Sequence, residues 1–199
     1  MRISAPGLGA LMVLALLAGC RTLPPPALAP GAPYAERRPQ LQALTHFQLK
    51  GRVALSANGN GFNANLRWLQ DRARSQVSLE GPLGVGGMQI TADGDDLDIV
   101  TSKGERISNQ AAHAELIARL GFDVPLESLR YWVLGVPDPG QPAEESLDPA
   151  RQRLAALAQD GWHVTYTDYT SAGSQNLPAR LTLERDAVRV RVFIENWQL

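Results

Sequence analysis

The chain has 199 residues, of which 44% are hydrophobic and 20% charged, and its 19 Lys and Arg residues nearly balance its 20 Asp and Glu residues. This balance gives no sign of the basic surface that a nucleic-acid partner requires. A single cysteine cannot form an internal disulfide. The roughly 160 residues after position 40 suit one domain with one hydrophobic core.

The first 19 residues have the pattern of a signal peptide. Arg2 precedes an apolar run from Leu8 to Ala18, which is far shorter than the ~20 residues that a membrane-spanning helix needs. The sequence Leu17-Ala18-Gly19-Cys20 matches the lipobox at which bacterial lipoproteins are cut. We therefore expect residues 1–19 to be removed and Cys20 to carry an acyl anchor. The alternative is an ordinary secretory signal followed by an unmodified cysteine.

The residues after Cys20 indicate a destination and a tether. Arg21 stands where an aspartate would resemble the inner-membrane retention signal of Gram-negative lipoproteins. Arginine instead indicates the periplasmic face of the outer membrane. Residues 20–40 are rich in proline and alanine, a composition typical of extended chain that packs poorly. We expect a tether over 20–40 and one folded domain over 41–199.

The first half of this domain alternates between apolar and polar residues, which is the pattern of strands with one solvated face. An Asn-Gly-Asn-Gly turn at 58–61 predicts a hairpin between the first two strands. The expected strands are 46–55, 62–68, 74–80, 88–92, 97–101 and 106–107.

The apolar period then changes from that of a strand to that of a helix. Ser108 or Asn109 can cap a helix that ends at Gly121. A second helix is expected to begin at Pro125 and to extend to Gly135. These two helices separate the strands before them from the strands after them.

The last part of the chain returns to strands after a proline-rich loop over 137–149. Residues 151–159 have a composition that favours helix, but the Asp160-Gly161 pair after them is a hairpin turn. Both alternatives stay open, and we favour a strand. Alternation then predicts a strand over 162–166 and a C-terminal hairpin over 179–194.

This order of elements predicts a mainly β fold of the α+β class. A sheet with one apolar face needs cover. We expect a strongly curved antiparallel sheet, or open barrel, whose concave face is closed by the two central helices. The hollow beneath them is either a packed core or a site for apolar ligands, and the sequence alone favours the packed core.

The usual motifs of catalysis and cofactor binding are missing. His46, His113 and His163 have no metal-ligand spacing. No Gly-x-Ser-x-Gly motif occurs, and the acidic run at 93–98 lacks the register of a calcium loop. The glycine-rich turn at 81–87 has no following lysine, so it is not a phosphate-binding loop. We expect no catalytic residue, no metal and no cofactor.

The turn at 81–87 is unusual because its tip carries Leu83 and Val85. An exposed turn would normally carry Asn, Asp or Ser there, and the flanking glycines cannot bury the two side chains. Either the loop folds back on the sheet, or it presents Leu83 to an apolar partner. A bilayer fits a membrane-tethered protein, since inserting one leucine contributes about 2 kcal/mol.

Several motifs together resemble one family, the outer-membrane lipoprotein receptors called LolB. They cover almost the whole mature chain in order: Leu17–Cys20, Phe47-x-Leu49-x-Gly51-Arg52-Val53-Ala54, Gly81-Pro82-Leu83-Gly84, Pro125-Leu126-x-x-Leu129-Arg130-x-Trp132-Val133-Leu134-Gly135, Gly161-Trp162-x-Val164-x-Tyr166-x-x-Tyr169, Leu177-Pro178 and Asn196-Trp197. The resemblance implies an unclosed antiparallel β-barrel with helices as a lid over a hydrophobic cavity. It shifts the expectation for the hollow towards ligand binding.

The resemblance also implies a function. The family accepts acylated lipoproteins from the periplasmic carrier LolA and passes them into the lipid of the outer membrane. In the family a leucine of the protruding turn is needed for membrane insertion, and Leu83 occupies that place. We expect a monomeric transport chaperone without catalytic activity. The alternative is a lipoprotein binding module for a protein or an envelope polymer, without lipid transfer.

Alternation and helix faces predict which side chains line the cavity, with ordinary core packing as the alternative for each. The expected lining residues are Phe47, Leu49, Leu66, Trp68, Ile90, Leu116, Leu129 and Trp132.

Overall fold

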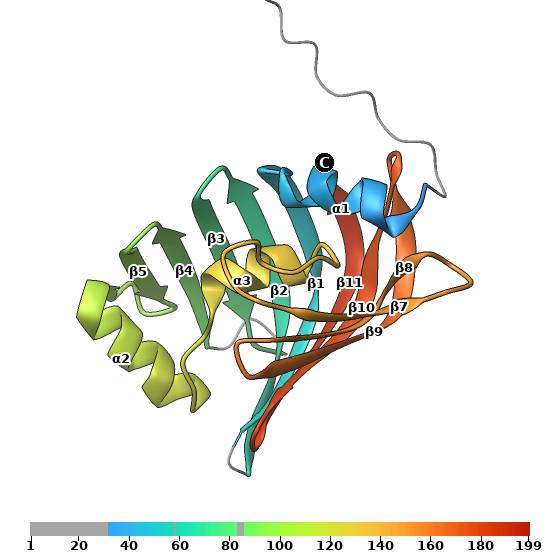
Figure 1. Cartoon of the computed structure of the whole chain (residues 1–199). Coiled ribbons are helices and arrows are strands. Elements are labelled where there is room, and N and C mark those ends of the chain that lie inside the picture. The colour runs from blue at the N-terminus through green and yellow to red at the C-terminus, as the bar shows by residue number, and fades with distance from the viewer. Residues whose placement is uncertain (1–31, 58, 83–85) are drawn as a thin grey trace, which may run out of the picture.

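A computed structural model describes residues 32–57, 59–82 and 86–199. Over these residues the chain forms an 11-stranded antiparallel sheet in the order β6-β5-β4-β3-β2-β1-β11-β10-β9-β8-β7. The edge strands β6 and β7 do not pair, so the sheet curls strongly but does not close (Figure 1). The strands are β1 (His46–Ala57), β2 (Asn60–Asp71), β3 (Arg74–Glu80), β4 (Gly87–Asp93), β5 (Asp96–Thr101), β6 (Arg106–Ser108), β7 (Glu144–Asp148), β8 (Arg153–Gln159), β9 (Trp162–Ala172), β10 (Gln175–Arg185) and β11 (Val188–Gln198).

Three helices accompany this sheet: α1 (Tyr34–Gln42), α2 (Asn109–Leu120) and α3 (Leu126–Trp132). Figure 1 shows α3 crossing the concave face in front of the central strands, with α2 beside β5. Gly121 ends α2 in the left-handed conformation, with φ of 83°, as the helix stop predicted. The expected curved, unclosed sheet with a helical cover is confirmed.

The pairing of β1 with β11 joins the two halves of the sheet. Its register shifts between Lys50 and Gly51, which is a β-bulge. A Cβ at Gly51 would lie 2.0 Å from the carbonyl oxygen of Phe193, so only glycine allows this approach. A bulge bends its strand and increases the local twist, and this one therefore contributes to the curvature that produces the concave face.

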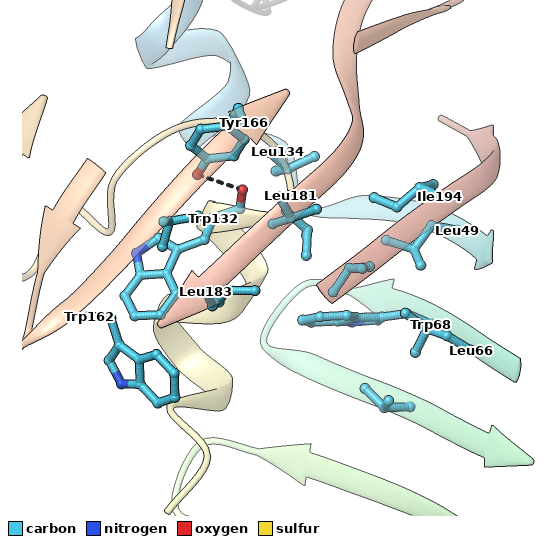
Figure 2. Close-up of a cluster of buried hydrophobic side chains, with 14 of the residues drawn as sticks. Leu49, Leu66, Trp68, Trp132, Leu134, Trp162, Tyr166, Leu181, Leu183 and Ile194 are labelled. Carbon is cyan, nitrogen blue, oxygen red and sulfur yellow. Dashed lines mark hydrogen bonds between the residues drawn. The ribbon is translucent and has the colours of Figure 1, made fainter. Parts of the chain in front are cut away.

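The core lies on that concave face. The first part of β1 and most of β2 alternate between exposed and buried residues, as the period of two predicts. Trp132, at the end of α3, and Leu181, in the second half of the sheet, are both fully buried. Figure 2 shows side chains from both halves of the sheet meeting those of α3 in one cluster. The two halves thus share a single core.

Residues 151–159 were ambiguous in sequence, and the structure places strand β8 there, so the strand alternative is correct. The loop expected over 137–149 is wrong in part, because residues 144–148 form the edge strand β7 against β8. Strand β7 is mostly polar, so it lacks the alternation of apolar residues that predicts a strand. Polar residues nevertheless suit a strand at the edge of a sheet. Helix α3 ends at Trp132 and not at Gly135 as expected. The chain turns over residues 133–135, and Gly135 has a φ of 77°, which does not continue a helix.

Residues 34–40, which we expected in the tether, form most of α1 instead. The helix packs against the end of the sheet through Tyr34, Arg37 and Leu41. The Tyr34 hydroxyl donates to Glu145 Oε2 at 2.5 Å, and burial raises the pKa of this tyrosine. The folded part of the chain therefore begins before residue 41.

Candidate functional site

An apolar cavity of about 110 Å³ has walls from the sheet and from the lid, by which we mean α2, α3 and the connector at 121–125 between them. The sheet supplies residues from both of its halves. The lining consists of Val53, Leu55, Phe62, Leu66, Trp68, Val77, Leu79, Ile90, Trp162, Leu183, Val190 and Val192 from the sheet, and of Leu120, Phe122, Val124, Pro125, Leu126, Leu129 and Val133 from the lid and its end.

Among the described residues, the lining side chains that carry a polar atom are Trp68 and Trp162, and neither indole nitrogen is open to the cavity. The Trp68 N–H donates to Gln70 Oε1 at 3.0 Å, and Gln70 Oε1 also accepts from Ser75 Oγ at 2.6 Å. The Trp162 N–H is buried and has no acceptor among the described residues. Leaving a buried donor unpaired costs about 1–3 kcal/mol. Apart from these groups, the cavity wall is hydrocarbon and aromatic ring, which suits an aliphatic ligand.

The lid is held firmly where α3 ends. The Trp132 indole donates to Gln159 Oε1 at 2.8 Å, and the Tyr166 hydroxyl donates to the Trp132 carbonyl at 2.9 Å. Gln159 Nε2 donates in turn to the Asp138 carbonyl at 2.8 Å. Burial raises the pKa of Tyr166 well above its ordinary value, which keeps its hydroxyl protonated as a donor. These bonds fix the end of α3 to β8 and β9.

The connector at the other end of α3 is held mainly by apolar contacts. Phe122 meets the Trp162 ring edge-on, with ring centroids 5.5 Å apart. Between the connector and the sheet, one hydrogen bond is formed in the described part of the chain, from Arg185 Nη2 to the Asp123 carbonyl at 3.5 Å. The Arg185 guanidinium also lies 4.5 Å from the centroid of the Trp162 ring. Fewer polar contacts therefore hold the connector to the sheet than hold the end of α3.

The structure brings four of the eight predicted lining residues to the cavity: Leu66, Trp68, Ile90 and Leu129. The other four are buried in the core away from it. Phe47 packs on Trp68 with centroids 6.0 Å apart, and Trp132 forms the anchor described above. Leu49 and Leu116 are buried as well. Whether any of the eight binds a ligand stays a prediction.

Sequence reasoning missed the part of the lining that comes from the C-terminal half, above all Trp162 and Val192. Alternation marked both as facing inward. Their place at the cavity depends on the pairing of β1 with β11, in which Val53 lies opposite Val192. No local pattern reports a pairing between segments so far apart in the chain.

Two predicted functional residues, Cys20 and Leu83, lie outside the described residues. The turn that contains Leu83 joins β3 to β4, and the Gly81 N–H donates to the Gly86 carbonyl at 3.0 Å across its base. Within the described ranges, no helix is long and apolar enough to cross a membrane. The same residues contain no group of acidic, histidine or cysteine side chains that could hold a metal ion.

Comparison with solved structures shows the fold. A LolA superfamily protein from Nitrosomonas europaea has a TM-score of 0.54 at 12% identity, over 87% of this chain and 94% of that chain. A DUF1329 family protein from Desulfovibrio piger has a TM-score of 0.57 at 8% identity, over 86% of this chain and 93% of that chain. At such identities the likeness is one of architecture.

Comparison of sequences shows the family. The family model described as outer membrane lipoprotein LolB matches residues 45–197. A protein named outer-membrane lipoprotein LolB from Nitrosococcus oceani is 36% identical, over 95% of each chain. One of the same name from Alkalilimnicola ehrlichii is 35% identical, over 100% of this chain and 97% of its own. This chain therefore belongs to the outer-membrane lipoprotein LolB family.

Proposed function

We propose that the protein accepts acylated lipoproteins from the periplasmic carrier LolA and delivers them into the outer membrane. The observation that carries this proposal is the apolar cavity between the sheet and the lid. Family membership supports the same conclusion, because the relatives are named outer-membrane lipoproteins of the LolB type. In this role the protein moves a ligand between sites and makes or breaks no covalent bond.

The size of the cavity indicates how acyl chains enter it. A dry cavity of about 150 Å³ holds a single benzene molecule, whereas the cavity here measures about 110 Å³. A whole acyl chain does not fit into that space, so binding requires the lid to move away from the sheet. Lifting the connector enlarges the cavity while the Trp132 anchor holds the end of α3.

The transfer step is driven by relative affinity. Each methylene that leaves water for an apolar wall contributes about 0.8 kcal/mol, and part of this gain offsets the cost of opening the lid. Acyl chains then leave the cavity for the bilayer, where their burial is complete. Each step runs downhill, so no nucleotide is needed.

Two residues outside the described ranges have roles in this proposal. Acyl groups on Cys20 hold the protein at the outer membrane, since two acyl chains give a lasting anchor. Leu83 enters the lipid next to the cavity and assists release. The composition of the turn at 81–87 and the family resemblance support the second role.

Replacing Leu83 with Glu tests the delivery step. We expect the Leu83→Glu variant to accept a labelled lipoprotein from the carrier at the normal level and to lose delivery to liposomes. Leu69→Glu is the matched control, because Leu69 is a leucine of β2 whose side chain is already 38% exposed. Full delivery by Leu83→Glu would remove Leu83 from the mechanism. Absence of acceptance by the unaltered protein would instead favour a binding module without lipid transfer.

A further inference from the structure

The four tryptophans of the chain differ in one respect. All four are buried, and three of them donate their indole N–H to an acceptor within the protein. The Trp162 N–H is the exception, since it is buried and the part of the chain that the structure describes offers it no acceptor. The acceptors of the other three are Gln70 Oε1 for Trp68 at 3.0 Å, Gln159 Oε1 for Trp132 at 2.8 Å and the Pro178 carbonyl for Trp197 at 2.9 Å.

The unpaired donor belongs to a side chain of the cavity wall. Trp162 lines the cavity at the start of β9 and is 1% exposed. Figure 2 shows its indole nitrogen at the ring edge farther from Trp132. Phe122 of the connector and Arg185 cover the ring. The nitrogen itself has no surface open to the cavity in this structure, so a ligand reaches it only once the connector moves away.

Water is a poor partner for this donor. A buried water needs two to four polar groups around it. Among the described lining residues, the only other one with a polar side-chain atom is Trp68, and its nitrogen already donates to Gln70. A ligand that brings one acceptor on an otherwise apolar body satisfies Trp162 without adding further polar groups to the cavity.

An acylated lipid has this composition, because each of its chains ends in an ester or amide carbonyl beside the polar part of the molecule. We propose that the Trp162 indole N–H donates a hydrogen bond to an acyl carbonyl oxygen of the bound lipid. This inference rests on the proposed function. The bond fixes how deeply the chains enter, and it favours acyl lipids over ligands that are only hydrocarbon.

The experiment uses the soluble domain and a synthetic triacylated lipopeptide that carries two glyceryl esters and one amide. A second lipopeptide has ether links in place of both esters. Affinities for the two probes are measured with the unaltered domain and with Trp162→Phe, which keeps an aromatic ring and removes the donor. Trp68→Phe is the matched control, because it shortens another cavity tryptophan whose N–H is already paired.

If an ester carbonyl accepts the bond, the unaltered domain binds the ester probe about 2- to 12-fold more tightly than the ether probe. Trp162→Phe then loses this preference, and Trp68→Phe keeps it. If the amide carbonyl accepts, Trp162→Phe weakens binding of both probes equally. If Trp162→Phe binds each probe as tightly as the unaltered domain does, the inference is overturned. Failure of the unaltered domain to bind either probe would instead contradict the proposed function.

A second readout follows the donor itself. With 15N-labelled tryptophan the domain gives one indole N–H signal for each tryptophan, and the signal that Trp162→Phe lacks identifies Trp162. Addition of the lipopeptide should move this signal downfield, which a purely structural tryptophan would not show. The Trp197 signal is the internal reference, because its bond to Pro178 lies away from the cavity. An unmoved Trp162 signal at saturation would count against the bond.

Discussion

The indole nitrogen of Trp132 lies 2.8 Å from Gln159 Oε1, and this hydrogen bond ties the end of the lid to strand β8. Gln159 is almost fully buried and also accepts from the Asp138 backbone N–H at 2.9 Å. Its amide nitrogen donates to the carbonyls of Asp138 and Gln141. The Gln159 side chain thus supplies hydrogen-bond partners both to the end of α3 and to the loop that follows it.

Replacing Gln159 with Leu should lower the free energy of unfolding by about 3 kcal/mol or more, because several buried groups lose their partners at once. Urea unfolding of the soluble domain measures the change. Gln48→Leu, at an exposed position of β1, serves as the control and should change stability little. Equal effects of the two substitutions would mean that Gln159 does not hold the lid.

A side chain at Gly135 should destabilise the domain. Its φ is 77°, and a Cβ there would lie 3.1 Å from both Pro178 Cγ and the Tyr169 hydroxyl. The left-handed conformation alone costs an L-residue about 1–2 kcal/mol, and the contacts add to that cost. Gly173→Ala separates the two effects, since Gly173 has φ of 57° and nothing within 4 Å of its Cβ position. We expect Gly135→Ala to lower the melting temperature more than Gly173→Ala does; the reverse order would contradict the packing described.

The stability of the domain should fall in alkaline solution. Burial raises the pKa of Tyr166 well above the ordinary tyrosine value of 10.0. A group whose pKa is raised on folding contributes stability that is present below its unfolded pKa and is lost as the pH rises through its folded pKa. The free energy of unfolding should therefore decrease from about pH 10 upward, by up to about 1.4 kcal/mol per pH unit for this one group.

Tyr166→Phe checks the source of this dependence. The variant should be less stable at neutral pH, because the Trp132 carbonyl loses its donor, yet its stability should fall less steeply above pH 10. Denaturant unfolding at several pH values gives both slopes. If stability falls equally steeply with pH in both proteins, the alkaline loss of stability comes from other groups. Tyr34 and Tyr169 are candidates, because burial raises the pKa of each.

The proposed anchor at Cys20 should be separable from acceptance. The cavity is formed by the folded domain alone, so a Cys20→Ala form, exported and soluble, should still accept lipoproteins from the carrier. It should deliver them to the wrong bilayer, because nothing holds it at the outer membrane. Fractionation of inner and outer membranes measures the destination. Loss of acceptance would show that the anchor takes part in ligand transfer.

Much of this fold could be predicted because its signals are local. A period of two fixes which face of a strand is buried, and it placed Leu66, Trp68 and Ile90 correctly on the cavity side. Helix α2 was marked by its period and by Gly121. In the helices, however, the period identifies the buried face but not which residues of that face reach the cavity. Leu116 is therefore buried in the core, whereas Leu120 lines the cavity.

The features that escaped prediction depend on contacts between distant segments. Helix α1 contains Pro39 and follows a proline-rich stretch, so local propensity argues against it. It is stabilised by packing at the end of the sheet and by the Tyr34 bond to Glu145 of β7. The edge strand β7 is likewise defined by its pairing with β8 and not by an apolar pattern.

The most direct test of the central claim asks which face of the sheet the acyl chains touch. Val192 lines the cavity, and its neighbour Arg191 points to the opposite face of β11. A small diazirine amino acid is placed at one position or the other, the domain is loaded by the carrier with a lipoprotein whose acyl chains are labelled, and the sample is irradiated. The proposal predicts cross-linking to the acyl chains from position 192 and none from position 191. Cross-linking from position 191 with none from position 192, in a loaded domain, would contradict it.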